Sequence, residues 1–173
     1  TIVEPAASIL LEWATKLSKI APIVFDPNIR SSVVSDRTKY QAAVARWTAI
    51  SAVIKVSEDD LAWLYPDRDQ LEVAAQWLSE GADLVIITKG SYGLIGITSQ
   101  GSVTVPGVKV EVADTVGAGD TVGAIVVEAI VERGLSTLHG EVLREVLTRA
   151  AKAASITCSR AGANPPTRAE IEG

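Results

Sequence analysis

Asp83-Leu84-Val85-Ile86-Ile87-Thr88 is a continuous apolar run with one polar residue at each end. A strand of this composition has no polar face, which is typical of a strand covered by helices on both sides of a parallel sheet. A helical pattern from Asp69 to Ser79, closed by Gly81, leads into the run. Beyond it, short strands are expected, punctuated by Gly90, Gly93, Gly96 and Gly101. The run therefore indicates a central strand of an α/β fold.

The same alternation of helix and strand extends in both directions. Toward the N-terminus, two segments with apolar residues at helical spacing each lead to a short apolar run. These pairs are Pro5 to Ile20 with Pro22 to Phe25, and Asp36 to Ile50 with Ala52 to Val56. Toward the C-terminus, helices are expected at Ala118 to Arg133, which is charge-free from Thr121 to Val127 and so expected to be buried, and at Gly140 to Ile156. This order predicts an open, mainly parallel sheet with helices on both faces.

The composition limits the classes of protein that fit. The chain has 173 residues, of which 47% are hydrophobic and 21% charged, and this favours one compact domain over disorder. A net charge of −5 offers no basic surface to nucleic acid or to an anionic membrane. No apolar stretch is long enough to cross a bilayer. With one cysteine, Cys158, and one histidine, His139, both interpreted as structural, no internal disulfide and no Cys/His zinc site are expected. We expect a cytoplasmic protein.

The most informative motif is Asp114-Thr115-Val116-Gly117-Ala118-Gly119-Asp120, which opens the helix at Ala118. Its glycines let the backbone approach an anion, and N–H groups of a first helical turn point toward such an anion. The motif therefore predicts an anion hole at Gly117, Ala118 and Gly119. The Asp120 carboxylate beside it suits a base that accepts a proton from an attacking hydroxyl. The alternative is that Asp114 and Asp120 cap the helix and the glycines form a turn, but the whole string is more specific than one glycine pair.

This string resembles the second signature, D-T-x-G-A-G-D, of the PfkB family of carbohydrate kinases. Three further segments resemble family motifs and occur in the family's order: Asp26-Pro27-Asn28-x-Arg30, Thr88-Lys89-Gly90-Ser91-Tyr92-Gly93 and Arg160-Ala161-Gly162-Ala163. The resemblance implies a ribokinase-like, Rossmann-like three-layer α/β/α fold with a mainly parallel sheet. It also implies ATP-dependent phosphorylation of a sugar hydroxyl, with residues 1–173 forming the C-terminal nucleotide-binding and catalytic part.

The resemblance assigns roles to individual residues. Asp120 would be the catalytic base in contact with the sugar, and the ATP phosphates and ribose would lie beside Thr88, Gly90 and Gly93. A strand end and a hairpin turn are the plainer explanations of those three residues. Ala151 stands where the family often has Asn or His beside adenine, so base recognition would depend on apolar contacts.

Two further sets of positions are less distinctive. Ser57 and Asp60 stand where the family commonly has N-x-x-E, a segment associated with ATP and Mg²⁺, but a helix N-terminus capped by Ser57 explains them equally well. Asn28 and Arg30 would reach the sugar, or else form an Asx turn and a loop salt bridge. Many members also bind a monovalent cation such as K⁺. The matching positions, which offer mainly carbonyl oxygens, are Asp114, Val116, Thr157, Arg160 and Gly162.

The segment Cys158 to Pro166 looks most like fructokinase-type members, with ribokinase or 2-keto-3-deoxygluconate kinase as alternatives. The family's first half, which supplies a lid, a first signature and an acidic residue that holds the sugar, has no counterpart in these residues. We therefore expect a truncated or divided kinase that is inactive alone and that associates with itself or with an N-terminal half. A hypothesis of another class is a nucleotide-binding or assembly module without phosphotransfer.

Overall fold

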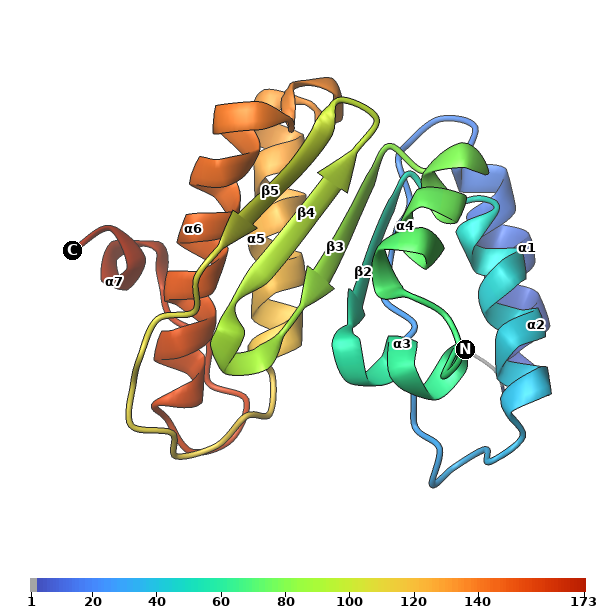
Figure 1. The fold of residues 1–173 in the computed structure, drawn as a ribbon, viewed down its shortest axis with the longest axis horizontal. Helices are drawn as coiled ribbons and strands as arrows, with labels where there is room; N and C mark the ends of the chain where they lie inside the picture. The colour runs from blue at the N-terminus through green and yellow to red at the C-terminus, as the bar shows by residue number, and fades with distance from the viewer. Residues whose placement is uncertain (1–2) are drawn as a thin grey trace. The chain divides into compact units, whose positions relative to one another are not determined.

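The computed structural model describes residues 3–173 and has the α/β architecture expected from the sequence (Figure 1). Five strands form one mainly parallel sheet in the order β1-β2-β3-β4-β5, which is also their order along the chain. The chain divides into two compact units, with the boundary between Ile86 and Ile87 inside strand β3 (Leu84–Thr88). The assignment of residues 1–173 to one catalytic part stays a prediction.

The first unit alternates helices with parallel strands. Its elements are α1 (Ala6–Leu17), β1 (Val24–Phe25), α2 (Arg37–Thr48), β2 (Val53–Ser57), α3 (Glu58–Leu64), α4 (Gln70–Ser79) and the start of β3. Strands β1 and β2 pair in parallel, with Val24 opposite Val53 and Phe25 opposite Ile54. Asp36 and Asp69 cap α2 and α4 by accepting backbone N–H groups of the first turn. The sequence pattern therefore placed these helices correctly, to within a few residues at their ends.

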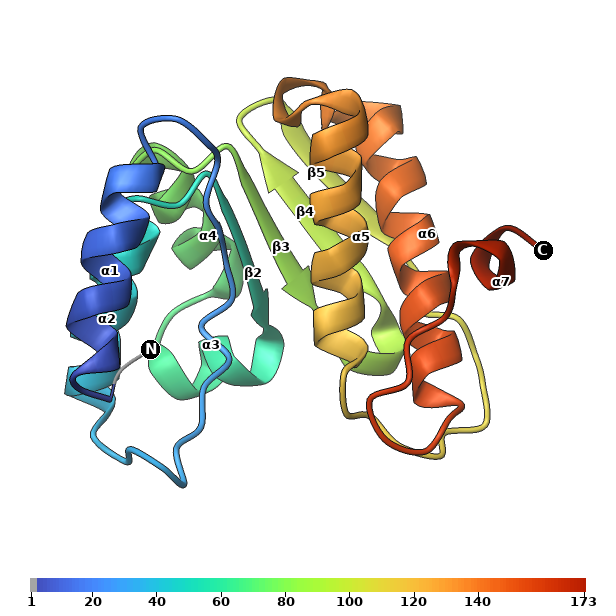
Figure 2. The same ribbon diagram turned by 180° about the vertical axis from the view of Figure 1, so that it is seen from behind.

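The second unit is built from a hairpin and two long helices. After β3 come β4 (Leu94–Thr98), β5 (Gly101–Val105), α5 (Ala118–Arg133), α6 (Gly140–Cys158) and the short α7 (Arg168–Glu172). Strands β4 and β5 are antiparallel, with Leu94 opposite Val105 and Thr98 opposite Gly101. Helices α5 and α6 lie side by side, and α6 packs against the hairpin (Figures 1 and 2).

Two details differ from the sequence-based expectation. Gly96 does not separate strands but lies inside β4, where an added Cβ would be 2.8 Å from the Cδ1 atom of Leu147 on α6. A glycine there lets α6 pack close to the sheet. Helix α5 buries only one side, including Val122 and Val126, whereas Val131 is 80% exposed, because α5 packs against α6 on one face only.

None of the helices in residues 3–173 is long and apolar enough to span a bilayer.

Candidate nucleotide and phosphoryl-transfer site

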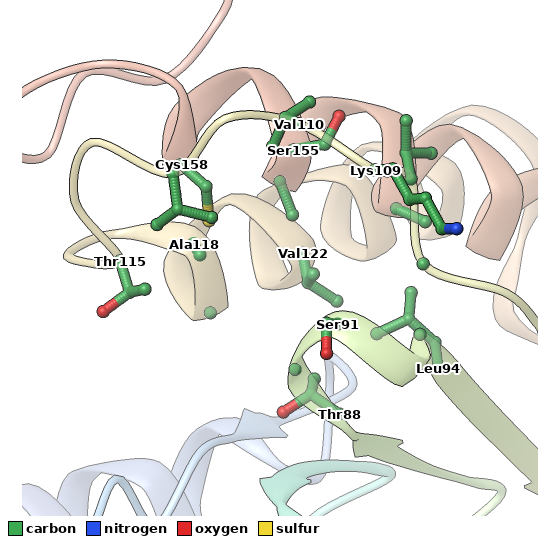
Figure 3. A pocket seen from close by; sticks show the side chains of 18 residues that line it. Thr88, Ser91, Leu94, Lys109, Val110, Thr115, Ala118, Val122, Ser155 and Cys158 are labelled. Carbon is green, nitrogen blue, oxygen red and sulfur yellow. The ribbon is translucent and has the colours of Figure 1, made fainter.

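A cavity of about 570 Å³ lies within the second unit. Its walls come from four segments far apart in sequence: the loop after β3, the loop after β5, the start of α5 and the end of α6. Figure 3 shows Thr115 and Ala118 at one end of the cavity and Lys109 and Leu94 at the other. Most of the lining side chains are apolar. A volume of this size, lined in this way, is typical of a small-molecule site.

The loop after β3 and the chain leaving β5 approach each other so closely that there is no room for a side chain at Gly93 or at Gly107. Gly93 has φ 103°, and a Cβ added there would be 2.1 Å from the carbonyl oxygen of Val105. A Cβ added at Gly107 would be 2.3 Å from the carbonyl oxygen of Ser91. The Lys89 N–H donates to the Gly93 carbonyl at 2.8 Å and closes the turn. The glycines predicted to border ATP therefore shape one wall of the cavity.

The signature motif forms the start of α5, as expected. Gly117 precedes the helix with φ 83°, a left-handed conformation that favours glycine. The side chain of Thr121 holds this turn, because its hydroxyl lies 2.9 Å from the carbonyl of Gly117 and 2.9 Å from the hydroxyl of buried Thr157 on α6. Ala118 and Gly119 line the cavity, and the Ala118 N–H makes a weak 3.3 Å bond to the Thr115 carbonyl. The positive end of a 16-residue helix dipole thus adjoins the cavity.

The two acidic residues of the motif differ in environment. Asp114 is held by backbone donors: its Oδ1 accepts the Val116 N–H at 3.0 Å and its Oδ2 accepts the Gly162 N–H at 3.0 Å. These hydrogen bonds hold the pKa of Asp114 below its usual value. Asp120, in the first turn of α5, is exposed. Of the two, Asp120 has the accessible carboxylate that a base needs.

Asp114 also joins the signature to the C-terminal motif. Through its bond to Gly162, it brings together three of the positions associated with a monovalent cation, the third being Val116. Thr157 is buried and bonded to Thr121, while Arg160 pairs with Glu170 at 2.5 Å. Among residues 3–173 there is no group of three or more His, Cys, Asp or Glu side chains arranged for a metal ion. Binding of a monovalent cation by carbonyls at these positions stays a prediction.

The remaining predicted residues belong to the first unit. The Asn28 N–H donates to Asp26 Oδ1 at 3.0 Å, so an Asx turn is present with Asp26, and not Asn28, as the accepting side chain, and Asn28 adopts a φ of 43°. The Arg30 guanidinium donates to the Ile29 carbonyl at 2.9 Å. Both side chains are exposed, and their binding roles remain predictions.

Ser57 caps α3 by accepting the Asp60 N–H at 3.0 Å, which confirms the cap. Burial raises the pKa of Asp60, partly offset by hydrogen bonds from Ser57 and from the Ile29 backbone N–H. Whether Ser57 and Asp60 also contact ATP or Mg²⁺ stays a prediction. Of the predicted site residues, the structure gathers six around the cavity: Thr88, Gly90, Gly93, Ala118, Gly119 and Ala151.

Sequence reasoning missed much of the cavity wall. Most of the missed residues are in the loop after β5 and near the end of α6: Gly107, Val108, Lys109, Val110, Val112, Ala154, Ser155 and Cys158. Leu94 of β4 and Val122 of α5 were missed as well. Apolar wall residues have the same composition as core residues, so the pattern alone carried no signal. Cys158 was interpreted as purely structural, but it lines the cavity. Burial, with a smaller contribution from the charge of Asp114, raises the pKa of its thiol, which makes it a weak nucleophile.

A model of the pfkB family of carbohydrate kinases matches residues 3–170. Among curated proteins, a fructokinase from Rhizobium leguminosarum bv. trifolii is 40% identical over 128 residues, which cover 70% of this chain and 39% of that protein. An aminoimidazole riboside kinase from Salmonella typhimurium (strain LT2) is 32% identical over 124 residues, or 67% of this chain and 37% of that protein.

The fold also matches solved structures. A fructokinase from Vibrio cholerae O395, solved with fructose, ADP and calcium ion bound, superposes with a TM-score of 0.84 at 25% identity, and the match covers 98% of this chain and 56% of that one. The chain thus has a ribokinase-like fold and spans roughly two fifths to somewhat over half of the proteins it matches.

Proposed function

The chain belongs to the pfkB family of carbohydrate kinases, and from this membership we propose that it carries the nucleotide-binding and catalytic part of a fructokinase-like sugar kinase. The reaction is transfer of the γ-phosphoryl group of ATP to a sugar hydroxyl. The observation that carries the proposal is the cavity in the second unit, where the glycine loop after β3, the start of α5 and Ala151 surround one volume.

ATP would lie along this cavity with its two ends in different surroundings. The base occupies the part lined by Val110, Val122 and Ala151, where recognition depends on apolar contacts. The ribose and phosphates follow Thr88, Gly90 and Gly93 toward the backbone of Ala118 and Gly119. There the N–H groups and the dipole of α5 favour negative charge. An apolar end and an electropositive end match the two ends of a nucleotide.

The chemical step assigns Asp120 the role of general base. Its carboxylate takes the proton as the sugar hydroxyl attacks the γ-phosphorus and the bond to the ADP oxygen breaks. The backbone at Gly117, Ala118 and Gly119 stabilises the charge that develops on the transferred group. Asp114 does not serve as the base, because both of its oxygens accept backbone N–H groups. Its role is to hold the loop in shape.

Two ions are proposed cofactors. Mg²⁺ would neutralise part of the phosphate charge, and it is typically held mainly by the phosphates themselves. The family resemblance suggests that Asp60 and Ser57 are the protein residues that help to hold Mg²⁺. The fit is limited, because the Asp60 carboxylate is half-buried and already interacts with the Ile29 N–H. K⁺ would lie at the carbonyls near Asp114, Val116, Thr157, Arg160 and Gly162.

The acceptor is proposed to be fructose, with Asn28 and Arg30 of the first unit as the sugar-binding residues that the family resemblance suggests. The 40% identity to a fructokinase supports this choice. A nucleoside acceptor is a second candidate, favoured by the 32% identity to an aminoimidazole riboside kinase. Ribose and 2-keto-3-deoxygluconate remain alternatives. Because the chain spans only part of its relatives, catalysis is proposed to need the rest of the fold, supplied in the same chain or by an associated one.

The test is a coupled ADP assay of the full-length gene product with ATP, Mg²⁺ and each of the four acceptors in turn. Fructose should give the highest kcat/KM, and the D120N variant is the control for contaminating kinases. If the protein binds ATP but forms no ADP with any of the four acceptors, the result would contradict the proposal and favour the nucleotide-binding module. The same assay with and without K⁺ tests the monovalent cation. The cytoplasmic location stays a prediction.

A further inference from the structure

The first unit contains a buried charge that neither the motifs nor the proposed reaction explains. Lys55 lies in the middle of β2 between Ile54 and Val56, both fully buried, and its own side chain is only 7% exposed. A lysine at such a position is costly unless its ammonium group is paired. An apolar residue in place of Lys55 would be enough to pack this part of the strand. The charge therefore has another explanation.

Its partner is the first residue of the Asp26-Pro27-Asn28-Ile29-Arg30 loop. Lys55 Nζ lies 2.5 Å from Asp26 Oδ2. The register of the sheet brings them together, because Phe25 pairs with Ile54 and the next residue on each parallel strand is Asp26 or Lys55. The side chain of Asp26 is 29% exposed, so the pair lies at the edge of the core and is largely shielded from water. The ammonium group holds one oxygen of Asp26 in place.

The other oxygen of Asp26 controls the backbone of the loop. Asp26 Oδ1 accepts the Asn28 N–H at 3.0 Å, and Asn28 adopts φ 43°, a left-handed conformation that is uncommon for residues other than glycine and that Asn adopts more readily than most. Hydrogen bonds from neighbouring groups stabilise such a conformation. The Asp26 carboxylate, which Lys55 orients, is one of the groups that hold Asn28 in this conformation.

A second residue holds the end of the loop. The hydroxyl of Tyr40, on α2, accepts the Arg30 N–H at 3.1 Å and donates to the Arg30 carbonyl at 3.2 Å. The Tyr40 ring is itself fixed edge-on against Trp63, with 5.3 Å between ring centroids. Ile29 is buried between these two attachments, whereas the side chains of Asn28 and Arg30 are exposed. The backbone is thus held from inside while two polar side chains point outward.

We propose that Lys55 and Tyr40 are positioning residues for the phosphoryl acceptor, acting through the backbone of the Asp26–Arg30 loop. Lys55 orients Asp26, Asp26 imposes the conformation of Asn28, and Tyr40 fixes Arg30. The inference rests on the proposed function, in which Asn28 and Arg30 bind the sugar. Since displacing a binding group by about 1 Å can cost about a hundredfold in rate, loss of either attachment should weaken acceptor binding without changing the nucleotide cavity.

The experiment compares acceptor and ATP kinetics in the full-length enzyme. K55M fills a similar volume without the charge, K55R keeps the charge, and Y40F keeps the ring. The matched control is S51A, which removes a buried 2.7 Å hydrogen bond to the Trp47 carbonyl in the same unit but none of the hydrogen bonds that hold the loop. We expect the acceptor KM to rise about tenfold or more in K55M and about threefold or more in Y40F, with a smaller change in the KM for ATP. K55R should recover most of the loss, and S51A should change neither KM.

Equal increases in both KM values, or an acceptor KM in K55M and Y40F no higher than in S51A, would overturn the inference. If K55M does not fold, Y40F decides the matter by the same criterion. If the parent enzyme phosphorylates no acceptor, the proposed function fails, and the positioning role is then decided by amide hydrogen exchange at Asn28. Exchange about tenfold faster in K55M or Y40F than in S51A supports it, and unchanged exchange refutes it.

Discussion

Replacing Gly93 by alanine should damage both the stability of the second unit and its nucleotide cavity. The φ of 103° is unfavourable for any residue with a Cβ and costs about 1–3 kcal/mol. The new Cβ would also lie 2.1 Å from the Val105 carbonyl oxygen and 2.6 Å from the Gly107 nitrogen. Because both are backbone atoms, relief requires the chain leaving β5 to move, which costs about 1–3 kcal/mol more. The expected loss is therefore about 2–6 kcal/mol.

Gly101 provides the matched control. It also has a positive φ, 129°, but a Cβ added there has nothing within 4 Å. G101A should therefore show the backbone strain alone, about 1–3 kcal/mol, with unchanged ATP affinity. The difference between G93A and G101A isolates the steric contact. It should be about 1–3 kcal/mol and be accompanied by at least about tenfold weaker ATP binding in G93A, because the displaced segment carries Val108 and Val110 of the cavity wall.

The assays are urea unfolding of both variants and calorimetric titration with ATP in the full-length protein. A stability loss in G93A no larger than in G101A would refute the close approach of the two loops. Unchanged ATP affinity in a destabilised G93A would instead show that this wall does not contact the nucleotide.

Four further predictions address the reaction and the C-terminal helix. D120N in the full-length enzyme should lower kcat by about two to four orders of magnitude in steady-state assays while ATP binding is kept, since general-base catalysis contributes on that scale; kcat within a few-fold of the parent would exclude the role. G119V should impair turnover even at saturating ATP, because a β-branched side chain intrudes at the phosphoryl end of the cavity, and full activity would count against an anion hole there. The 173-residue chain alone should release no ADP with fructose, with its D120N variant as the control for contaminants. Hydrogen bonds from the Thr167 backbone N–H, and then from Arg160, lower the pKa of Glu170 to about 2. The ionised carboxylate therefore stabilises α7 fully above the pKa of the unfolded state, 4.5, and this stabilisation is lost as the pH falls through the folded-state pKa of about 2. E170Q should therefore flatten the decline of the urea midpoint over that pH range, and identical profiles would contradict the assignment.

Much of the fold could be predicted because local patterns determine it. The helix beginning at Ala118 and ending at Arg133 was predicted with the bounds observed for α5, since Gly117 and Gly134 stand just outside it. The apolar run now seen as β3 indicated a buried strand, because no polar face was available to water. The signature likewise indicated the glycine turn that opens α5, and Ala118 and Gly119 of that turn line the cavity, whereas phosphate binding there stays a prediction.

Contacts across long stretches of sequence were decided only by the tertiary structure. The Lys55–Asp26 pair joins residues 29 apart, and the Thr121–Thr157 bond joins residues 36 apart. The sequence placed Lys55 in an apolar run without a reason for its charge, and only the register of β1 against β2 supplied one. The cavity wall after β5 was missed because valines that line a ligand site and valines that fill a core look alike along the chain. Local patterning chooses the elements, whereas partners and cavities depend on how those elements pack, which no single segment encodes.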